Sequence, residues 1–305
     1  MEVINTAYVQ NLIKERPADL HKGQAGRVLI IAGSKGMAGA AVLATRGALY
    51  SGSGLIKVAV PDELFTILQI SVPEAMCIER DRLMEAAGTA GGTDEAADGF
   101  LAEYDAVCIG PGIGTGKESG DLVRRVISEY SGPLLIDADG INCLCKYKLL
   151  DELRLRARKG EKYSTVLTPH PGEADRLLKA LRLRTLRQGD SDALNREEAV
   201  RILAEATGAV VLLKGLGTLI ADKISIFRNP TGNPGMATGG SGDVLSGIIT
   251  SLMGQKFLGM TAYEAAAAGA FIHGLAGDIA AENIGEYGMT AADIADAISV
   301  VFKEI

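Results

Sequence analysis

The segment from Asn229 to Gly247 contains the residues of this chain that are best suited to bind a phosphate. It reads NPTGNPGMATGGSGDVLSG and is rich in glycine. The glycines at positions 239, 240 and 242 have no Cβ, so successive backbone N–H groups can turn toward one anion. The apolar run 244–253 predicts a helix, and the N-terminus of a helix attracts anions. We therefore expect an anion site in front of this helix.

Asp243 lies at the expected start of that helix, where a carboxylate can have two roles. Asp is a common N-cap residue, and its side chain would then only satisfy free amide groups of the first turn. Beside a bound phosphate it could instead take a proton from a hydroxyl group as a general base. A helix N-terminus lowers the pKa of a carboxylate, so the base role requires that a bound ligand exclude water. The density of glycines around Asp243 favours the anion site.

Apolar, β-branched runs bounded by glycine or proline recur along the chain and predict strands. Most of their consecutive positions are apolar, as in a parallel sheet covered on both faces. Helix-like stretches separate the runs, so the pattern predicts an α/β fold, a three-layer α/β/α sandwich with a mostly parallel central sheet. The expected strands are residues 27–32, 55–60, 106–109, 133–136, 165–167 and 209–213, with an edge hairpin at 218–220 and 224–227 and the clearest helices at 40–50, 120–130, 196–207 and 261–281.

Segments rich in glycine, proline and aspartate follow five of the expected strands. In a doubly wound sheet the ligand binds beyond the carboxyl ends of the strands. Any one of these segments could be an ordinary turn, but five at the same edge predict one cleft lined by backbone. They are residues 33–40, 110–114, 137–140, 168–173 and 214–218.

Some side chains in these segments have more than one interpretation. His170 stands between two prolines, which favours ligand contact over core packing. Glu173 could cap the next helix or help to hold a metal ion with nucleotide phosphates. Lys214 could lie at the surface, but the glycines after it would let a phosphate or adenine approach the main chain. Asp137 and Asp139 are second-rank candidates because both suit a turn.

Composition excludes several classes of function. The 305 residues are 47% apolar with a formal net charge of −7 and no cluster of Lys and Arg, so neither nucleic acid nor a membrane is expected as a partner. The four cysteines show no zinc-ligand or redox spacing. No signal peptide or membrane span is recognisable, so a cytoplasmic protein is expected. We expect one domain over residues 1–305, with a short helical extension at 1–20 and a surface insertion at 86–99.

Taken together, these motifs resemble the ADP- or ATP-dependent NAD(P)H-hydrate dehydratase family, repair enzymes with a ribokinase-like fold. The resemblance covers nearly the whole chain, and its most specific part is the order of TPHPGE (168–173), NPTGN (229–233) and GGSGD (239–243). It implies that a nucleoside phosphate phosphorylates the hydroxyl of the hydrated nicotinamide ring, and that loss of phosphate restores NADH or NADPH. Bacterial and archaeal members use ADP, and eukaryotic ones ATP.

The resemblance also implies roles for individual residues. Asp243 would take the proton of the attacking hydroxyl, while the glycine amides would stabilise the transferred phosphoryl group. Glu173 would be a candidate ligand for Mg²⁺. The hydrate would contact Ala40, Gly112 or Gly114, His170 and Asp243, and the nucleotide would be held by Lys214, Gly215, Leu216, Gly217, Thr218, Asn233, Gly240 and Gly242.

The resemblance extends to partners. A homo-oligomer is expected, and a separate NAD(P)H-hydrate epimerase would act in the same pathway, since no space for an epimerase domain precedes His21.

Two alternatives remain open at this point. A vitamin-precursor kinase of the same fold, of the hydroxyethylthiazole kinase type, would share the anion loop and base but release its phosphorylated product. A non-catalytic nucleotide sensor would bind without turnover, although the intact Asp243 argues against it.

Overall fold

Runs of consecutive apolar residues form a central sheet. The computed structural model describes residues 1–85, 100–186 and 194–305, and within these the sheet has ten strands in the order β1-β10-β9-β8-β7-β6-β5-β2-β3-β4. Neighbouring strands are parallel, except that β9 is antiparallel to both β8 and β10. The strands are β1 (Glu2–Val3), β2 (Arg27–Ile31), β3 (Leu55–Val60), β4 (Met76–Glu79), β5 (Ala106–Ile109), β6 (Leu134–Ile136), β7 (Thr165–Leu167), β8 (Val210–Leu213), β9 (Leu219–Ala221) and β10 (Ile226–Arg228).

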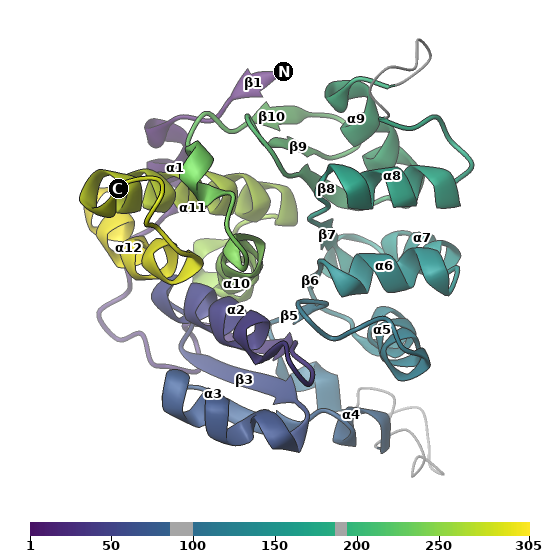
Figure 1. Cartoon of the computed structure of the whole chain (residues 1–305), viewed down its shortest axis with the longest axis horizontal. Coiled ribbons are helices and arrows are strands. Elements are labelled where there is room, and N and C mark those ends of the chain that lie inside the picture. The colour runs from purple at the N-terminus through teal and green to yellow at the C-terminus, as the bar shows by residue number, and fades with distance from the viewer. Residues whose placement is uncertain (86–99, 187–193) are drawn as a thin grey trace.

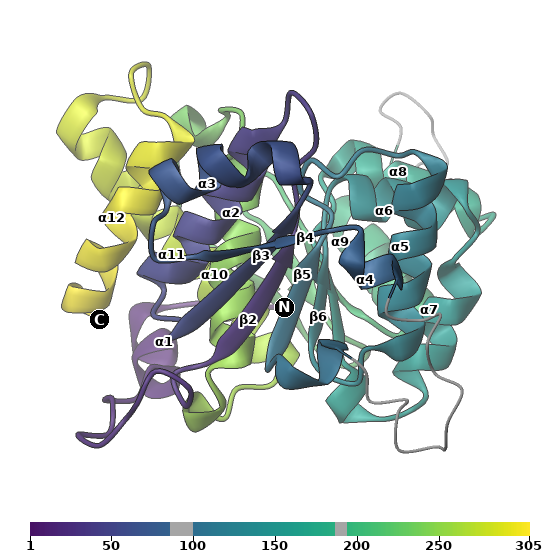
Figure 2. The same ribbon diagram turned by 90° about the horizontal axis from the view of Figure 1, so that it is seen from below.

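Helices cover both faces of the sheet and complete three layers (Figure 1 and, turned by 90°, Figure 2). Each face has its own hydrophobic core. One layer contains α1 (Thr6–Leu12), α2 (Ala38–Tyr50), α3 (Phe65–Ser71), α10 (Ser241–Gly254), α11 (Ala262–Ile284) and α12 (Ala291–Glu304). The other contains α5 (Lys117–Glu129), α6 (Asp139–Lys146), α7 (Leu150–Ala157), α8 (Pro171–Ala180) and α9 (Arg196–Thr207), and the short α4 (Arg82–Glu85) follows β4. Within the described ranges, no helix is both long and apolar enough to cross a membrane.

The predicted architecture is confirmed, with small shifts at the ends of elements. All six predicted strands and the hairpin are present. The hairpin is not the edge of the sheet, because β1 pairs in parallel with β10 outside it. The N-terminal extension, expected to be helical, therefore contains a strand as well as α1. Strand β4, at the other edge, was not predicted. The expected insertion at 86–99 lies outside the described residues.

Two glycines bring α2 and α10 into contact backbone to backbone. A Cβ on Gly47 would come within 2.3 Å of the Val244 carbonyl oxygen, and a Cβ on Gly247 within 2.0 Å of the Ala44 carbonyl oxygen. Any side chain at either position would therefore push the helices apart. This contact fixes the N-termini of α2 and α10 relative to each other beside the carboxyl edge of the sheet.

Candidate active site

The start of α10 forms an open turn of backbone amides. The helix begins at Ser241, three residues before the predicted start, so the amides of Gly242 and Asp243 belong to its first turn. Gly240 is the N-cap residue, with a left-handed φ of +93° and no side chain to cap the helix. Asp243 is therefore not the N-cap residue, which removes the simpler of its two interpretations. The first-turn amides are left available for an anion.

Asp243 has the electrostatic environment of a general base. Burial, and after it the neighbouring carboxylate of Asp137, raise the pKa of its carboxyl from 3.8 to about 7, against the lowering effect of Lys214. A carboxyl group with a pKa near neutrality can hold and release a proton under physiological conditions. The weakening expected from the helix N-terminus is thus outweighed in the protein itself, without a bound ligand.

Lys214 and Asp137 form a buried ion pair beside the start of α10. The Lys214 Nζ lies 2.8 Å from Asp137 Oδ1, and the Ser246 hydroxyl donates to Asp137 Oδ2 at 2.8 Å. Burial lowers the pKa of Lys214, but Asp137 and Glu173 outweigh it and raise the pKa, so the ammonium group stays charged. A Cβ on Gly242 would lie 3.3 Å from the Lys214 Nζ. The ammonium group therefore lies against the turn where an anion would bind.

Asp137 is a central residue of the site, although the sequence analysis ranked it only as a secondary candidate. Its side chain is 1% exposed and joins β6 to β8 and α10 through Lys214 and Ser246. The next residue, Ala138, has φ +47° and ψ −118°, a conformation that costs a non-glycine residue free energy. Asp139 then accepts a hydrogen bond from the Gly114 amide at 2.9 Å. Asp137 thus binds Lys214, whereas Asp139 binds the glycine loop after β5.

His170 and Glu173 form a capping box at the start of α8. The Gly172 amide donates to His170 Nδ1 at 3.0 Å, and the His170 amide donates to Glu173 Oε2 at 2.8 Å. The His170 side chain is 51% exposed, so it is not a core residue, and its Nε2 lies 3.4 Å from Glu173 Oε1. The structure favours the capping alternative for Glu173.

The surroundings of Glu173 do not fit a metal site. One carboxylate oxygen is engaged by the His170 amide, and the same oxygen lies 3.9 Å from the Lys214 ammonium. A divalent cation there would face a fixed positive charge. In the part of the chain that the structure describes, no group of three or more His, Cys, Asp or Glu side chains could hold a metal ion. The metal role of Glu173 stays a prediction that the geometry does not favour.

Two of the predicted substrate residues, Gly112 and Ala40, lie close together on the α2 side of the cleft. Gly112, with φ +63°, lies so close to α2 that a Cβ there would come within 2.9 Å of the Ala40 Cβ. Gly114, with φ +77°, has open space where a Cβ would be. The glycine loop after β5 therefore leaves a surface of backbone and one methyl group, which a flat ring could approach. The assignment of Ala40, Gly112 and Gly114 to the substrate stays a prediction.

An arginine that the sequence did not single out holds the predicted nucleotide loop. Arg196, the first residue of α9, donates to the carbonyl oxygens of Leu213 and Leu216. The Thr218 hydroxyl donates to the Gly215 carbonyl at 2.9 Å, which closes the turn over Gly217. Leu216 is left 93% exposed. An apolar side chain so open to water suits contact with a flat base, although contact with a nucleotide is not tested by the geometry.

Hydrogen bonds between the NPTGN segment and α11 hold this segment in place. Asn229 donates to the Ala270 carbonyl at 2.9 Å, and Asp278 accepts from the Gly232 amide and the Asn233 side chain, each at 2.9 Å. The Asn233 oxygen also accepts from the Gly235 amide. Both ends of the Asn233 amide are therefore engaged within the protein. Its role in nucleotide binding stays a prediction, and Asp278 is a positioning residue that the sequence analysis missed.

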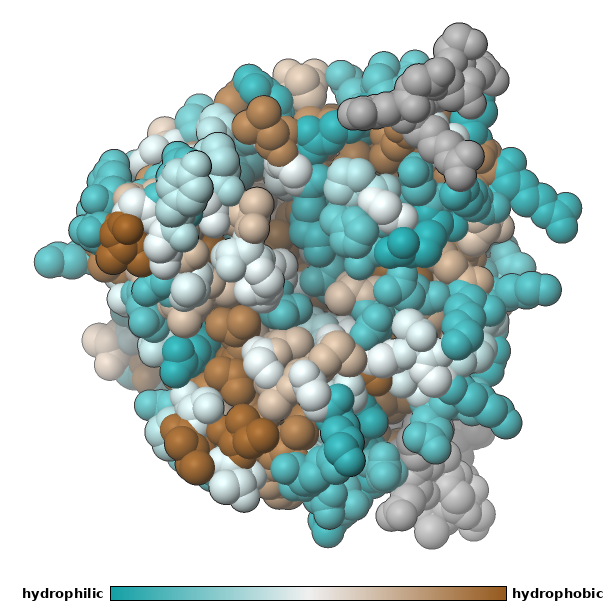
Figure 3. Space-filling model, viewed as in Figure 1, coloured by the Kyte–Doolittle hydropathy of each residue, from teal (hydrophilic) through white to brown (hydrophobic). Residues whose placement is uncertain are grey.

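His273, also on α11, packs against the start of α10. Its Nε2 lies 3.3 Å from the Ser241 hydroxyl. Burial lowers the pKa of His273 to about 4, so its ring is neutral near pH 7. A histidine within an apolar helix more often packs in the core, which is why sequence alone did not mark it. Figure 3 shows the face on which these segments meet, hollowed near its centre between the two helix layers.

The carboxyl edge of this mostly parallel sheet carries a helix start suited to an anion, a buried lysine and a carboxylate with a pKa near 7. These features define a nucleotide-dependent enzyme of the ribokinase-like class. Comparison with known proteins gives the family. The NAD(P)H-hydrate dehydratase profile matches residues 28–300, and the chain belongs to that family.

Individual relatives agree with this assignment. The chain is 38% identical over 99% of its length to the bifunctional NAD(P)H-hydrate repair enzyme of Moorella thermoacetica, covering 54% of that protein. It is 36% identical to the ADP-dependent (S)-NAD(P)H-hydrate dehydratase of Neisseria meningitidis, over 94% of this chain and 88% of that one. A crystal structure of the ADP/ATP-dependent dehydratase from Bacillus subtilis, co-crystallised with ATP and Mg²⁺, superposes with a TM-score of 0.78 at 26% identity and covers 99% of this chain and 98% of the other. The chain spans about half the length of several curated relatives that it matches.

Proposed function

We propose that the protein dehydrates NADH hydrate or NADPH hydrate with ADP or ATP as co-substrate. The observation that carries the proposal is the position of Asp243, with a pKa of about 7, in the first turn of α10 and close enough to Lys214 for the ammonium charge to lower that pKa. A hydroxyl group placed at Asp243 would lose its proton to the carboxylate as the terminal phosphoryl group is transferred to its oxygen. The amides of the Gly240–Asp243 turn and the Lys214 ammonium would stabilise the charge on that phosphoryl group.

The second half of the reaction restores the coenzyme. The C–O bond of the phosphate ester breaks, phosphate leaves with the bonding electrons, and a proton is lost from the neighbouring ring carbon. The products are then the reduced coenzyme, inorganic phosphate and the nucleotide with one phosphate fewer. The amides and lysine that bind the phosphoryl group during transfer also suit the departing phosphate.

We infer a division of the cleft into two halves. Support for the substrate half comes from the contact of Gly112 with Ala40 and from the exposed ring of His170. Support for the nucleotide half comes from the Arg196-held turn over Gly217 and from Lys214. Because Glu173 does not suit a metal, Mg²⁺ would enter on the nucleotide phosphates. We also propose that the protein is cytoplasmic and forms a homo-oligomer, whose size light scattering would measure. A separate epimerase would act in the same pathway and supply the reactive epimer.

The test is an assay of the purified protein with NADH hydrate and NADPH hydrate. With Mg²⁺ and ADP, the absorbance of reduced nicotinamide should rise and inorganic phosphate should be released in equal amount. The Asp243→Asn variant is the negative control. Failure with both ADP and ATP would refute the proposal. Accumulation of a phosphate ester without inorganic phosphate would identify a kinase instead, and a higher kcat/KM with ATP than with ADP would overturn the expectation, drawn from the family resemblance, that ADP is used.

A further inference from the structure

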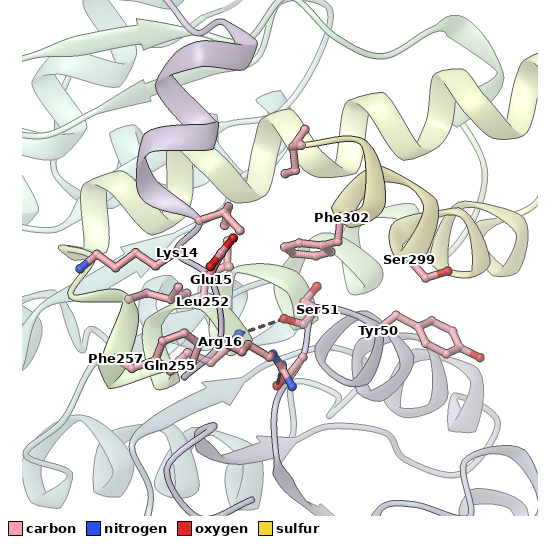
Figure 4. Close-up of a pocket in the computed structure, with 14 residues that line it drawn as sticks. Lys14, Glu15, Arg16, Tyr50, Ser51, Leu252, Gln255, Phe257, Ser299 and Phe302 are labelled. Carbon is pink, nitrogen blue, oxygen red and sulfur yellow. Dashed lines mark hydrogen bonds between the residues drawn. The ribbon is translucent and has the colours of Figure 1, made fainter. Parts of the chain in front are cut away.

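A second pocket lies at the ends of α2 and α10 that point away from Asp243. Its volume is about 440 Å³, within the range of small-molecule sites. Helix α10, which joins the two places, spans fourteen residues or about 20 Å. The pocket, which Figure 4 shows in close-up, is therefore separate from the cleft. It is lined by Ile13, Lys14, Glu15, Arg16, Tyr50, Ser51, Gly52, Leu252, Gln255, Phe257, Leu258, Ser299, Phe302 and Ile305.

One wall of the pocket carries a cation without a carboxylate partner. The Arg16 side chain is exposed and donates to the Gly52 carbonyl at 2.5 Å. Among the residues that the structure describes, no ion pair involves Arg16. In Figure 4, Glu15 lies between Lys14 and Phe302, and the Lys14 side chain runs away from Phe302. Because Gly52 directly follows Ser51, the hydrogen bond of Arg16 to Gly52 places this cation beside Ser51.

Ser51 supplies a buried hydroxyl group that lacks a partner. The residue is 3% exposed, and its Oγ has no hydrogen-bond partner among the described residues. Its carbonyl oxygen, by contrast, accepts from Gln255 Nε2 at 2.9 Å. A buried polar group without a partner costs free energy, and native proteins rarely leave one unless something else binds it. Figure 4 shows Ser51 between the Phe302 ring and Arg16.

Apolar and aromatic side chains complete the lining, together with the polar side chains of Lys14, Glu15, Tyr50, Gln255 and Ser299. Phe302 of α12 and Leu252 of α10 face the pocket together with Phe257, which belongs to the short turn after α10. An aromatic or aliphatic group could pack on these side chains while an anionic group reaches Arg16 and Ser51. A pocket that combines apolar walls with convergent polar groups is typical of a ligand site.

We propose that this pocket is a second binding site, for a small anion that carries an aromatic or aliphatic body. The anionic group, a carboxylate or a phosphate, is bound by the Arg16 guanidinium and accepts a hydrogen bond from the Ser51 hydroxyl. The body packs between Phe302 and Phe257. Nothing in the proposed dehydration requires this site, so its test is independent of that activity.

The test measures binding in the presence of saturating ADP, which would occupy the proposed nucleotide half of the cleft. Phenyl phosphate and 3-phenylpropanoate are titrated into the protein by calorimetry, with 3-phenylpropanol as the uncharged control. Binding is expected for at least one anion, and the stronger of the two identifies phosphate or carboxylate as the recognised group. Arg16→Gln should weaken that anion about tenfold, as expected for loss of a charge-assisted contact. Arg46→Gln is the matched control, because Arg46 also donates to a carbonyl, that of Ser71, but does not line the pocket.

A second variant separates binding from folding. Ser51→Ala removes a buried hydroxyl without a partner, so it should raise the melting temperature of the ligand-free protein while weakening the anion. A purely structural role for Ser51 would not give opposite signs. The proposal is overturned if neither anion binds in the presence of ADP, if 3-phenylpropanol binds equally well, or if Arg16→Gln and Arg46→Gln bind the anion with the same affinity.

Discussion

At the scale of single residues, the chemistry depends on the protonation of Asp243. Its pKa of about 7 means that the carboxylate form, which alone can accept a proton, becomes predominant only above neutral pH. We expect kcat/KM to rise with pH through about 7 and then level off. Asp243→Asn should lower kcat by about 10² to 10⁴, the usual contribution of a positioned general base, and leave ADP affinity nearly unchanged. Activity within a few-fold of the parent, or a flat pH profile from 5 to 8, would exclude the base role.

His170 combines a capping role with a predicted contact to the hydrate, and two substitutions separate them. Asn can replace the ring nitrogen as the acceptor for the Gly172 amide, whereas Ala cannot. His170→Ala should therefore cost about 1 kcal/mol of stability, and His170→Asn much less. Both should raise the KM for the hydrate. If His170→Asn restores both stability and KM to parental values, the residue acts only as a cap.

At the scale of elements, the turn between β6 and α6 stores backbone strain directly after Asp137. Ala138 adopts φ +47°, which costs a non-glycine residue about 1 to 3 kcal/mol. Ala138→Gly should relieve that strain, at an entropic cost of about 0.4 to 1 kcal/mol, and so raise the unfolding free energy by about 1 kcal/mol. Ala206→Gly, within α9, is the control and should destabilise the protein. Urea unfolding of both variants measures this, and destabilisation by Ala138→Gly would contradict it.

The same elements show why sequence predicted some features and missed others. Consecutive apolar residues and the glycines after them are local signals, so the parallel sheet and its cleft were predictable. The role of Asp137 was not, because it depends on Lys214, 77 residues away. Arg196 was missed for a similar reason, since its acceptors, Leu213 and Leu216, lie at the end of the next strand and just after it. The early start of α10 was missed because Ser-Gly-Asp has low helix propensity, which packing of α10 against α2 overrides.

At the scale of the whole molecule, the site should make stability depend on pH. The pKa of Asp243 is about 7 in the folded protein and near its ordinary 3.8 when unfolded. Between these values the folded state holds a proton that the unfolded chain has released, so this group lowers stability as pH rises from about 4 to about 7. Asn cannot ionise. Asp243→Asn should therefore have a melting temperature close to the parent at pH 4 and above it at pH 8. A difference that does not grow with pH would contradict the raised pKa.

Strand β1 has a practical consequence for any work with this protein. Glu2 and Val3 pair with Phe227 and Arg228, and the Ile4 amide donates to the Arg228 carbonyl, one residue before the NPTGN segment. An affinity tag joined to Met1 would extend from the start of β1. It could disturb the pairing of β1 with β10, which holds the chain next to the NPTGN segment. A tag at the other end would instead adjoin Ile305, in the wall of the second pocket. Tags should therefore be cleaved before nucleotide or anion affinities are measured.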